Sequence, residues 1–412
     1  MSLASANLKT KPATILCLNG GSSSIKFAVY AQDSLTVPLL QGAVKNIGVN
    51  TRFEYSDNGA DVHTNLHLKA ENPELAIHFL IGWLARQSNV GEIIYIGHRI
   101  VQGLEHTGPV RIDASLMGRL RLVESYAPDH LPREIRLIDA CEKAFPSAQQ
   151  IACFDTSFHQ AMPQLARYLP LPERYYNKGV RRYGFHGISY EYLLQELNDR
   201  EQSSVARHHV IMAHLGNGSS LVALKDGIPM DTTMSFTPTS GVMMGSRTGD
   251  LDPGLITYLL QNEGLTKEQF SHLVNHESGL KGISGISGDV LELLVHEKKS
   301  SQATLAIDLY CYHIRKAIGS LSAVLGGLDT IIFSGGIGEN SPVIRRRICG
   351  GLQYLGIELD EERNIHNKDM ISTRFRNVNV RVIRTNEELM IARSVLAVVQ
   401  KEPVNANQLC NA

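Results

Sequence analysis

The sequence has no excess of charge of either sign and no long hydrophobic run. In 412 residues, 40 lysines and arginines stand against 41 aspartates and glutamates, a formal net charge of −1. A near-neutral chain excludes nucleic-acid or membrane-surface binding driven by bulk charge. No stretch reaches the roughly 18 apolar residues of a membrane span, and the polar N-terminal segment lacks the apolar core of a signal peptide. We therefore expect neither nucleic acid nor membrane as a partner.

Cysteine is scarce and scattered. The six cysteines form no C-x-x-C pair and show no metal-ligand spacing with histidine, which indicates a reducing compartment. We expect a cytoplasmic protein in which these residues are small core side chains or surface thiols. They are Cys17, Cys141, Cys153, Cys311, Cys349 and Cys410.

Two common nucleotide-binding motifs are also missing. There is no Gly-Lys dipeptide, so no Walker A loop, and no G-x-G-x-x-G, so no standard dinucleotide fingerprint. Present instead are three glycine turns, at 19–24, 216–220 and 334–340, each directly after an apolar run. Backbone without Cβ atoms can approach phosphate oxygens closely. Each turn alone fits a plain hairpin better, but the three together favour binding of nucleotide phosphates.

The first two turns share one pattern. Gly20, Ser24 and Ile25 recur as Gly216, Ser220 and Leu221, always 196 residues further on. Each copy predicts a strand, a tight turn and a second strand. An offset near half the chain favours a duplicated domain. Chance similarity is the alternative, since glycine-serine turns between strands are common.

The rest of the chain predicts α/β layers in two lobes, because strands alternate with helices and a chain this long usually forms more than one core. Helices are expected over 303–325, with Leu305, Leu309, His313 and Leu321 on one stripe, and from Pro342 to Gly356. Residues 45–72 predict a peripheral hairpin or loop. The glycines at 279, 282, 285 and 288 predict a mobile loop.

Charged and imidazole groups follow several of the apolar runs. Arg99 and Asp155 both come at the predicted carboxyl ends of strands, where α/β sheets place their ligands. His186 and Arg247 lie in glycine-rich segments. For each of these residues alone, the simpler interpretation is that it only caps or solvates the end of a strand. As a set, they suit phosphoryl transfer, in which catalysis is mostly positioning and electrostatics.

The order of these motifs resembles the acetate and propionate kinases, the acetokinase family of the sugar kinase, heat-shock protein and actin superfamily. The resemblance covers nearly the whole chain. The matching segments are Leu18 to Lys26, Gly97-His98-Arg99, Phe154 to Gln160, Arg182 to Gly187, His214 to Gly218, Phe236-Thr237-Pro238, Met243 to Asp250, Ser334 to Ser341 and Thr385 to Glu388.

The resemblance implies an α/β fold of two similar lobes, each a mixed sheet flanked by helices, in the duplicated actin-like ATPase or ribonuclease H-like manner, with a nucleotide cleft between them. Residues 1–156 would form the N-terminal lobe, completed by a C-terminal helix within about 388–412, and residues 157–387 the nucleotide-binding lobe. A homodimer is also implied.

The implied reaction transfers the γ-phosphoryl group of ATP to a short-chain carboxylic acid, with Mg²⁺, giving ADP and an acyl phosphate. Arg99 and Arg247 would hold the carboxylate and the transferring group, His186 would stabilise that group, and Asp155 would position the reacting centre. The implied nucleotide-binding residues are Asn19, Ser22, Ser24, Lys26, His214, Asn217, Gly218, Asp289, Gly336 and Ile337. Asn19 and Glu387 are implied at the metal, and Val101, Asp129, His130, Phe185 and Pro238 in the acyl pocket.

The chain departs from the family pattern at four places. Asp129 stands where the family has an apolar leucine, and Leu291 where it has an arginine near adenine. Gln102-Gly103-Leu104 replaces His-Gly-Gly, and Ile188-Ser189-Tyr190 replaces Thr-Ser-His. Two alternatives therefore stay open. One is a kinase of the same fold for a polar or hydroxy acid, or with another phosphoryl donor; the other is a catalytically weak actin-like nucleotide-binding protein.

Overall fold

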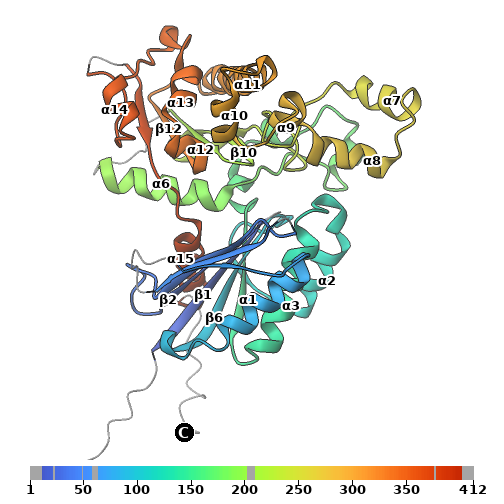
Figure 1. The fold of residues 1–412 in the computed structure, drawn as a ribbon, viewed down its shortest axis with the longest axis vertical. Helices are drawn as coiled ribbons and strands as arrows, with labels where there is room; N and C mark the ends of the chain where they lie inside the picture. Colours follow the sequence, from blue (N-terminus) through green and yellow to red (C-terminus); the bar gives the residue numbers. More distant parts are fainter. Residues whose placement is uncertain are drawn as a thin grey trace, which may run out of the picture. The chain divides into compact units, whose positions relative to one another are not determined.

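The chain folds into two compact α/β units, each a mixed sheet flanked by helices (Figure 1). The computed structural model describes residues 12–21, 24–48, 50–57, 64–201, 209–374 and 377–400. The first unit takes the described residues up to Asp155 and those from Asn386 onward, and the second unit is Thr156–Thr385. The predicted α/β class is confirmed. No helix in the described ranges has the length and apolarity that crossing a membrane requires.

The first unit has an eight-stranded sheet in the order β5-β4-β3-β2-β1-β6-β8-β7. Strand β1 pairs antiparallel with β2 and parallel with β6, and β6 pairs parallel with β8. The carboxyl ends of β1, β6 and β8 therefore meet at one edge of the sheet. The strands are β1 (Ala13–Gly20), β2 (Ile25–Ala31), β3 (Leu40–Lys45), β4 (Arg52–Asp57), β5 (Thr64–His67), β6 (Glu92–Ile100), β7 (Val110–Arg111) and β8 (Gln149–Phe154).

Helices cover both faces of this sheet. The helices are α1 (Pro73–Leu84), α2 (Ala114–Leu122), α3 (Leu131–Ala144) and α15 (Glu387–Gln400). Asn72 caps α1 by accepting from the Leu75 N–H, and Pro73 occupies the first turn. The apolar faces of α1 and α3 pack on Leu16, Leu18 and Phe27.

Helix α15 packs on β1 and β6, against the opposite face of the sheet. Gly97 makes this close approach possible, because a Cβ atom there would meet Ile391 and would lie 2.7 Å from a Val395 methyl group. Helix α15 ends at Gln400, and the rest of the expected C-terminal segment, 401–412, lies outside the described residues. Strands β4 and β5 form the peripheral hairpin expected within 45–72.

The second unit has a five-stranded sheet in the order β11-β10-β9-β12-β13. Strand β9 pairs antiparallel with β10 and parallel with β12, which is the arrangement of β1 with β2 and β6. Both copies of the predicted strand-turn-strand repeat are thus confirmed. The strands are β9 (His209–Leu215), β10 (Ser219–Lys225), β11 (Ile228–Thr232), β12 (Thr330–Ser334) and β13 (Asn379–Val382).

The long helix α11 packs on one face of this sheet, and α6 packs on β9. The helices of the second unit are α4 (Gln164–Arg167), α5 (Glu173–Tyr176), α6 (Gly187–Glu201), α7 (Pro253–Gln261), α8 (Lys267–His272), α9 (Gly279–Ser284), α10 (Val290–His296), α11 (Ser301–Leu325), α12 (Gly335–Asn340), α13 (Pro342–Cys349) and α14 (Glu361–Ile365).

Three details of the expected helices were wrong. The buried stripe of α11 runs through Ile307, Ile314 and Ile318 and includes Leu321 of the expected stripe, whereas Leu305 is half-exposed. The glycine-rich segment from residue 279 starts with a helix, α9, which packs on α11. The helix that begins at Pro342 ends at Cys349 instead of reaching Gly356, because Gly350 adopts an extended conformation.

Candidate active site

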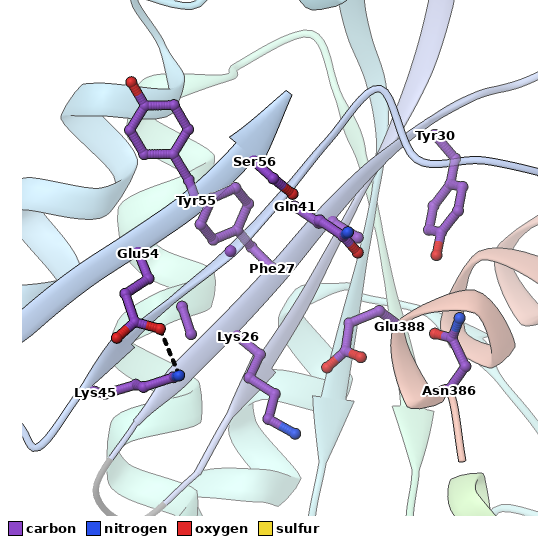
Figure 2. A pocket seen from close by; sticks show the side chains of 13 residues that line it. Lys26, Phe27, Tyr30, Gln41, Lys45, Glu54, Tyr55, Ser56, Asn386 and Glu388 are labelled. Carbon is purple, nitrogen blue, oxygen red and sulfur yellow. Dashed lines mark hydrogen bonds and ion pairs between the residues drawn. The ribbon is translucent and has the colours of Figure 1, made fainter. Parts of the chain in front are cut away.

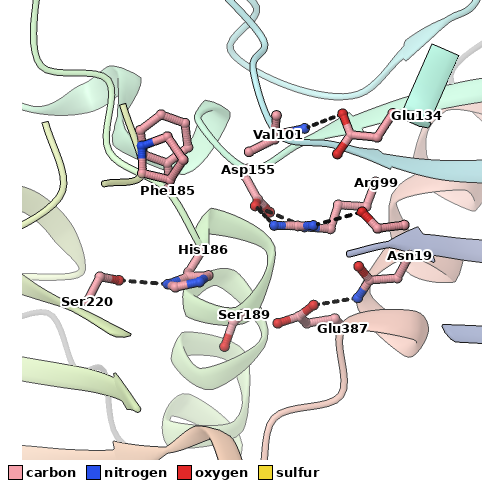
Figure 3. A network of polar contacts seen from close by, with 12 residues as sticks. Asn19, Arg99, Val101, Glu134, Asp155, Phe185, His186, Ser189, Ser220 and Glu387 are labelled. Carbon is pink, nitrogen blue, oxygen red and sulfur yellow. Dashed lines mark hydrogen bonds and ion pairs between the residues drawn. The ribbon is translucent and has the colours of Figure 1, made fainter. Parts of the chain in front are cut away.

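A buried ion pair stands at the carboxyl ends of β6 and β8. Arg99 donates from Nε and Nη2 to Oδ2 of Asp155, at 2.9 and 2.5 Å. The side chains are only 11% and 1% exposed. Nη1 of Arg99 lies 3.4 Å from the Gly20 carbonyl, at the end of β1 (Figure 3). The pair joins two predicted catalytic residues to the first glycine turn.

A third ionisable residue, which the sequence analysis missed, lies beside this pair. Glu134 is on the buried face of α3, and its Oε2 accepts from the Val101 N–H at 3.0 Å. Burial raises the pKa of Glu134 to about 8, although the charge of Arg99 and the Val101 hydrogen bond lower it. Burial alone would lower the pKa of Arg99, but the charges of Asp155, Glu387 and Glu134 raise it above its ordinary value. Arg99 therefore stays charged.

The first glycine turn meets the start of α15. Asn19 donates from Nδ2 to Glu387 at 2.6 Å and to Glu388 at 3.2 Å. Burial raises the pKa of Glu388, while the charge of Lys26 lowers it. The predicted neighbours Asn19 and Glu387 are thus in contact. Ser24 belongs to the same turn, where its carbonyl accepts from Gly21 N, and Ser22 lies outside the described residues.

A cavity of about 250 Å³ opens on the face of β2 and β3 near these acids (Figure 2). Lys26, Gln41, Asn386 and Glu388 line it, and the Lys45–Glu54 ion pair closes one side at 2.6 Å. No group of three or more His, Cys, Asp or Glu side chains in the described ranges is placed to hold a metal ion by itself.

In the second unit, two histidines stack beside the repeated glycine turn. The rings of His186 and His214 lie 4.3 Å apart between centroids. His186 has a left-handed backbone (φ 58°) directly before α6, a conformation that costs about 1–3 kcal/mol and is often kept at functional sites. Its Nδ1 lies 2.9 Å from Ser220 Oγ (Figure 3). Ser220 Oγ in turn lies 2.5 Å from the Tyr190 hydroxyl.

Arg247 lies next to the same turn. A Cβ atom on Gly218 would be 3.4 Å from both Arg247 Nη1 and His186 Nε2. Arg247 Nη1 also donates to the Pro238 carbonyl at 3.2 Å, and the Asn217 carbonyl accepts from Gly245 N at 3.1 Å. The second unit therefore gathers its predicted catalytic and phosphate residues around the second glycine turn.

His214 is held on its other side by hydroxyl groups. Its Nδ1 lies 2.8 Å from Ser189 Oγ, which also contacts Thr385 Oγ1 at 2.9 Å. The positions of Ser189 and Ser220 decide how both imidazoles are oriented. Both serines stand in motifs that the sequence displays, but their contacts with the imidazoles are visible only in the structure.

The third expected glycine turn is wrong as a turn, because helix α12 (Gly335–Asn340) begins directly after β12 and occupies this segment. Glu339 fixes the segment by accepting from Gly335 N at 2.9 Å and from Thr385 N at 3.1 Å. Gly336 is exposed at the helix start, and Ile337 packs against the core. Asp289 is exposed and caps α10 by accepting from Glu292 N, and the neighbouring Leu291 is 63% exposed. The structure thus gives Asp289 a capping role besides any contact with nucleotide.

Comparison with known proteins decides the family. The model of the acetokinase family matches residues 14–393. The chain belongs to the acetokinase family. It is 40% identical to the acetate kinase of Rhodopseudomonas palustris (strain TIE-1) over 92% of this chain and 97% of that protein, and 38% identical to the propionate kinase of Yersinia enterocolitica over 95% and 97%. The crystal structure of Porphyromonas gingivalis acetate kinase matches with a TM-score of 0.82, and that of a propionate kinase from Francisella tularensis with a TM-score of 0.86. Each is 34% identical in sequence, and each match covers 94% of this chain and all of the solved chain.

The acyl-pocket residues expected for an acetokinase family member fall in both units. In the first, Val101 and His130 are buried and Asp129 is half-buried just before α3. In the second, Phe185 is buried and its carbonyl lies 2.9 Å from His159 Nε2, and Pro238 is held by Arg247. The Val101 N–H donates to Glu134, which lies near Arg99, so Val101 belongs to the same polar cluster as Arg99.

Proposed function

We propose that this acetokinase family member transfers the γ-phosphoryl group of ATP to acetate or propionate, forming the acyl phosphate and ADP. Its relatives named acetate kinase and propionate kinase support this reaction. The observation that carries it is the buried Arg99 guanidinium, oriented by Asp155 at the strand ends. A planar, permanently charged fork suits a carboxylate and a phosphoryl group alike.

In the first unit, Asp155 acts on Arg99 by fixing two of its N–H groups, so that the guanidinium is oriented before the acid arrives. Mg²⁺ fits the Asn19 and Glu387 pair, because kinases hold this ion through one or two carboxylates together with phosphate oxygens and water. When bound, the ion would neutralise charge on the transferring phosphate. Ser24 and Lys26 complete the phosphate loop.

In the second unit, His186 and Arg247 serve the phosphoryl group. When the Tyr190 hydroxyl donates to Ser220 and Ser220 donates to His186 Nδ1, the proton of the neutral imidazole sits on Nε2. That N–H then donates to an oxygen of the transferring group. Arg247, beside Gly218, adds a positive charge where negative charge spreads over the phosphoryl oxygens.

We further propose that the first unit is the acid-binding lobe and the second the nucleotide-binding lobe, with the nucleotide held by His214, Asn217, Gly218, Asp289, Gly336 and Ile337. A homodimer is supported by the exposed apolar side chains Leu255, Ile256 and Tyr258 on α7. Sedimentation should then give about twice the chain mass of 45.4 kDa. The five described cysteines are all buried and form no disulfide, which supports the cytoplasm as its location.

A hydroxylamine trap tests the reaction. The protein is incubated with ATP, Mg²⁺ and hydroxylamine over a panel of acetate, propionate and their hydroxylated analogues, and hydroxamate is measured. We expect ATP-dependent hydroxamate with acetate or propionate. A preference for the hydroxy acids would instead favour the second candidate function, a kinase of the same fold for a polar or hydroxy acid. The half-buried Asp129 supports that candidate. Bound ATP with no hydroxamate from any acid would refute acyl transfer.

A further inference from the structure

Glu134 is a buried carboxyl group that the proposed reaction does not use. Its residue is 2% exposed, and it stands on the apolar stripe of α3 with Leu131, Ile135 and Ile138. Oε2 accepts one hydrogen bond, from Val101 N at 3.0 Å. Oε1 is buried without a hydrogen-bond partner in the described part of the chain (Figure 3).

The charges that surround Glu134 leave an ionised form poorly compensated. Arg99 on β6 is the neighbouring cation, but its Nε and Nη2 already pair with Asp155 after β8. Glu387 on α15 also acts on Arg99, and β1 faces the site with the backbone of Gly20. A second buried carboxylate beside one guanidinium therefore lacks a partner of its own, which disfavours its charged form.

Burial, helped by the charge of Asp155, accordingly raises the pKa of Glu134 to about 8 against the opposing effects of Arg99 and the Val101 hydrogen bond. Below that pH the carboxyl group is neutral, and the Arg99 charge is shared with Asp155 and Glu387 alone. Above it, a further negative charge lies next to the guanidinium that would hold the substrate carboxylate. Like charge there weakens binding of an anion.

We propose that Glu134 is a positioning residue that is uncharged when the acid binds, and that its ionisation sets the alkaline limit of carboxylate binding at Arg99. This inference rests on the proposed function, since it takes the substrate to be a carboxylate. Glu134 acts through Arg99 and through the Val101 N–H that it anchors, not by touching the substrate.

The kinetic test compares KM and kcat for acetate from pH 6 to 10 in the wild type, Glu134→Gln and Glu134→Leu. In the wild type, KM should rise about tenfold from pH 7 to pH 9, as a pKa of about 8 requires, while kcat at saturating acetate changes little. Both variants lack the ionisable group, so the rise should disappear in whichever of them folds. The exposed Glu142→Gln, two turns further along α3, is the matched control and should keep the rise. A rise that persists in the Glu134 variants, or a flat wild-type profile, would overturn the inference.

An infrared measurement gives a readout that is independent of activity. The difference between wild type and Glu134→Gln at pH 7 should contain the C=O stretch of a protonated carboxyl group, and the band should vanish as the pH passes about 8. No such band at pH 7 would overturn the inference. A band with this titration in a protein that forms no acyl phosphate would support the neutral Glu134 and would reject the proposed function.

Discussion

Breaking the Arg99–Asp155 pair from either side should cost the first unit much of its stability. Both side chains are nearly inaccessible, at 11% and 1%, and removing one partner of such a pair typically costs about 3–5 kcal/mol because the other charge stays buried. The charge of Glu387 remains near Arg99, so Asp155→Ala should fall at the low end, about 3 kcal/mol. Arg99→Ala should cost a similar amount.

Removing both partners leaves no unpaired charge, so the double variant should lose only about 4 kcal/mol, which gives a coupling energy of about 2 kcal/mol. Urea unfolding followed by tryptophan fluorescence measures this directly. The single tryptophan, Trp83, lies in α1 of the first unit, where its ring is 4.8 Å from both Phe53 and Tyr55. The signal therefore reports on the unit that contains the pair.

The surface pair Arg121–Asp139, in the same unit, is the matched control. Its side chains are 53% and 38% exposed at a separation of 3.3 Å, so its cycle should give below about 1 kcal/mol. If the losses at Arg99 and Asp155 simply add, within about 0.5 kcal/mol, the two groups do not stabilise each other and the reasoning is refuted.

Three other predictions follow from single positions. Gly97→Ala should destabilise the first unit by about 1–3 kcal/mol, because the new methyl group meets α15. The control Gly118→Ala in α2, where a Cβ atom would have no neighbour within 4 Å, should be neutral or stabilising. Equal effects of the two variants in urea unfolding would contradict the packing argument. Arg247→Ala should lower kcat at least about a hundredfold in a folded protein, and near-normal turnover would remove it from the mechanism. Asp129→Leu should raise kcat/KM for acetate and propionate by about tenfold over hydroxylated analogues, because about one to two kcal/mol of apolar contact is gained. An unchanged ranking of acids would show that Asp129 does not select the substrate.

The sequence was enough to predict the layers and the strand-end residues. Arg99 and Asp155 each come directly after, or near the end of, an apolar run, and the glycine repeat marks the hairpins β1–β2 and β9–β10. These signals are local, so a single chain displays them. The contact between Arg99 and Asp155 is different, since it depends on β6 and β8 being neighbours in the sheet.

Other features depend on packing that a sequence does not display. Helix α11 is apolar on more than one side, so two stripes fit its period, and contact with the sheet selects the one through Ile307 and Ile314. Helix α9 begins with a glycine, a poor helix former, and its packing on α11 supports it. The hydroxyl of Ser220 meets His186, 34 positions away in the sequence. Glu134 left one trace, a carboxyl group on the apolar stripe of α3.

ATP formation in the reverse direction tests the central claim most directly. The protein is given acetyl phosphate or, in a parallel assay, propionyl phosphate, each with ADP and Mg²⁺. ATP is measured for the wild type, Arg99→Ala and the exposed-site control Arg121→Ala. We expect the wild type and the control to form ATP at similar rates and Arg99→Ala to be slower by at least about a hundredfold. Absence of ATP from acetyl and propionyl phosphate alike, or an equal rate in folded Arg99→Ala, would contradict an acyl kinase that works through this buried guanidinium.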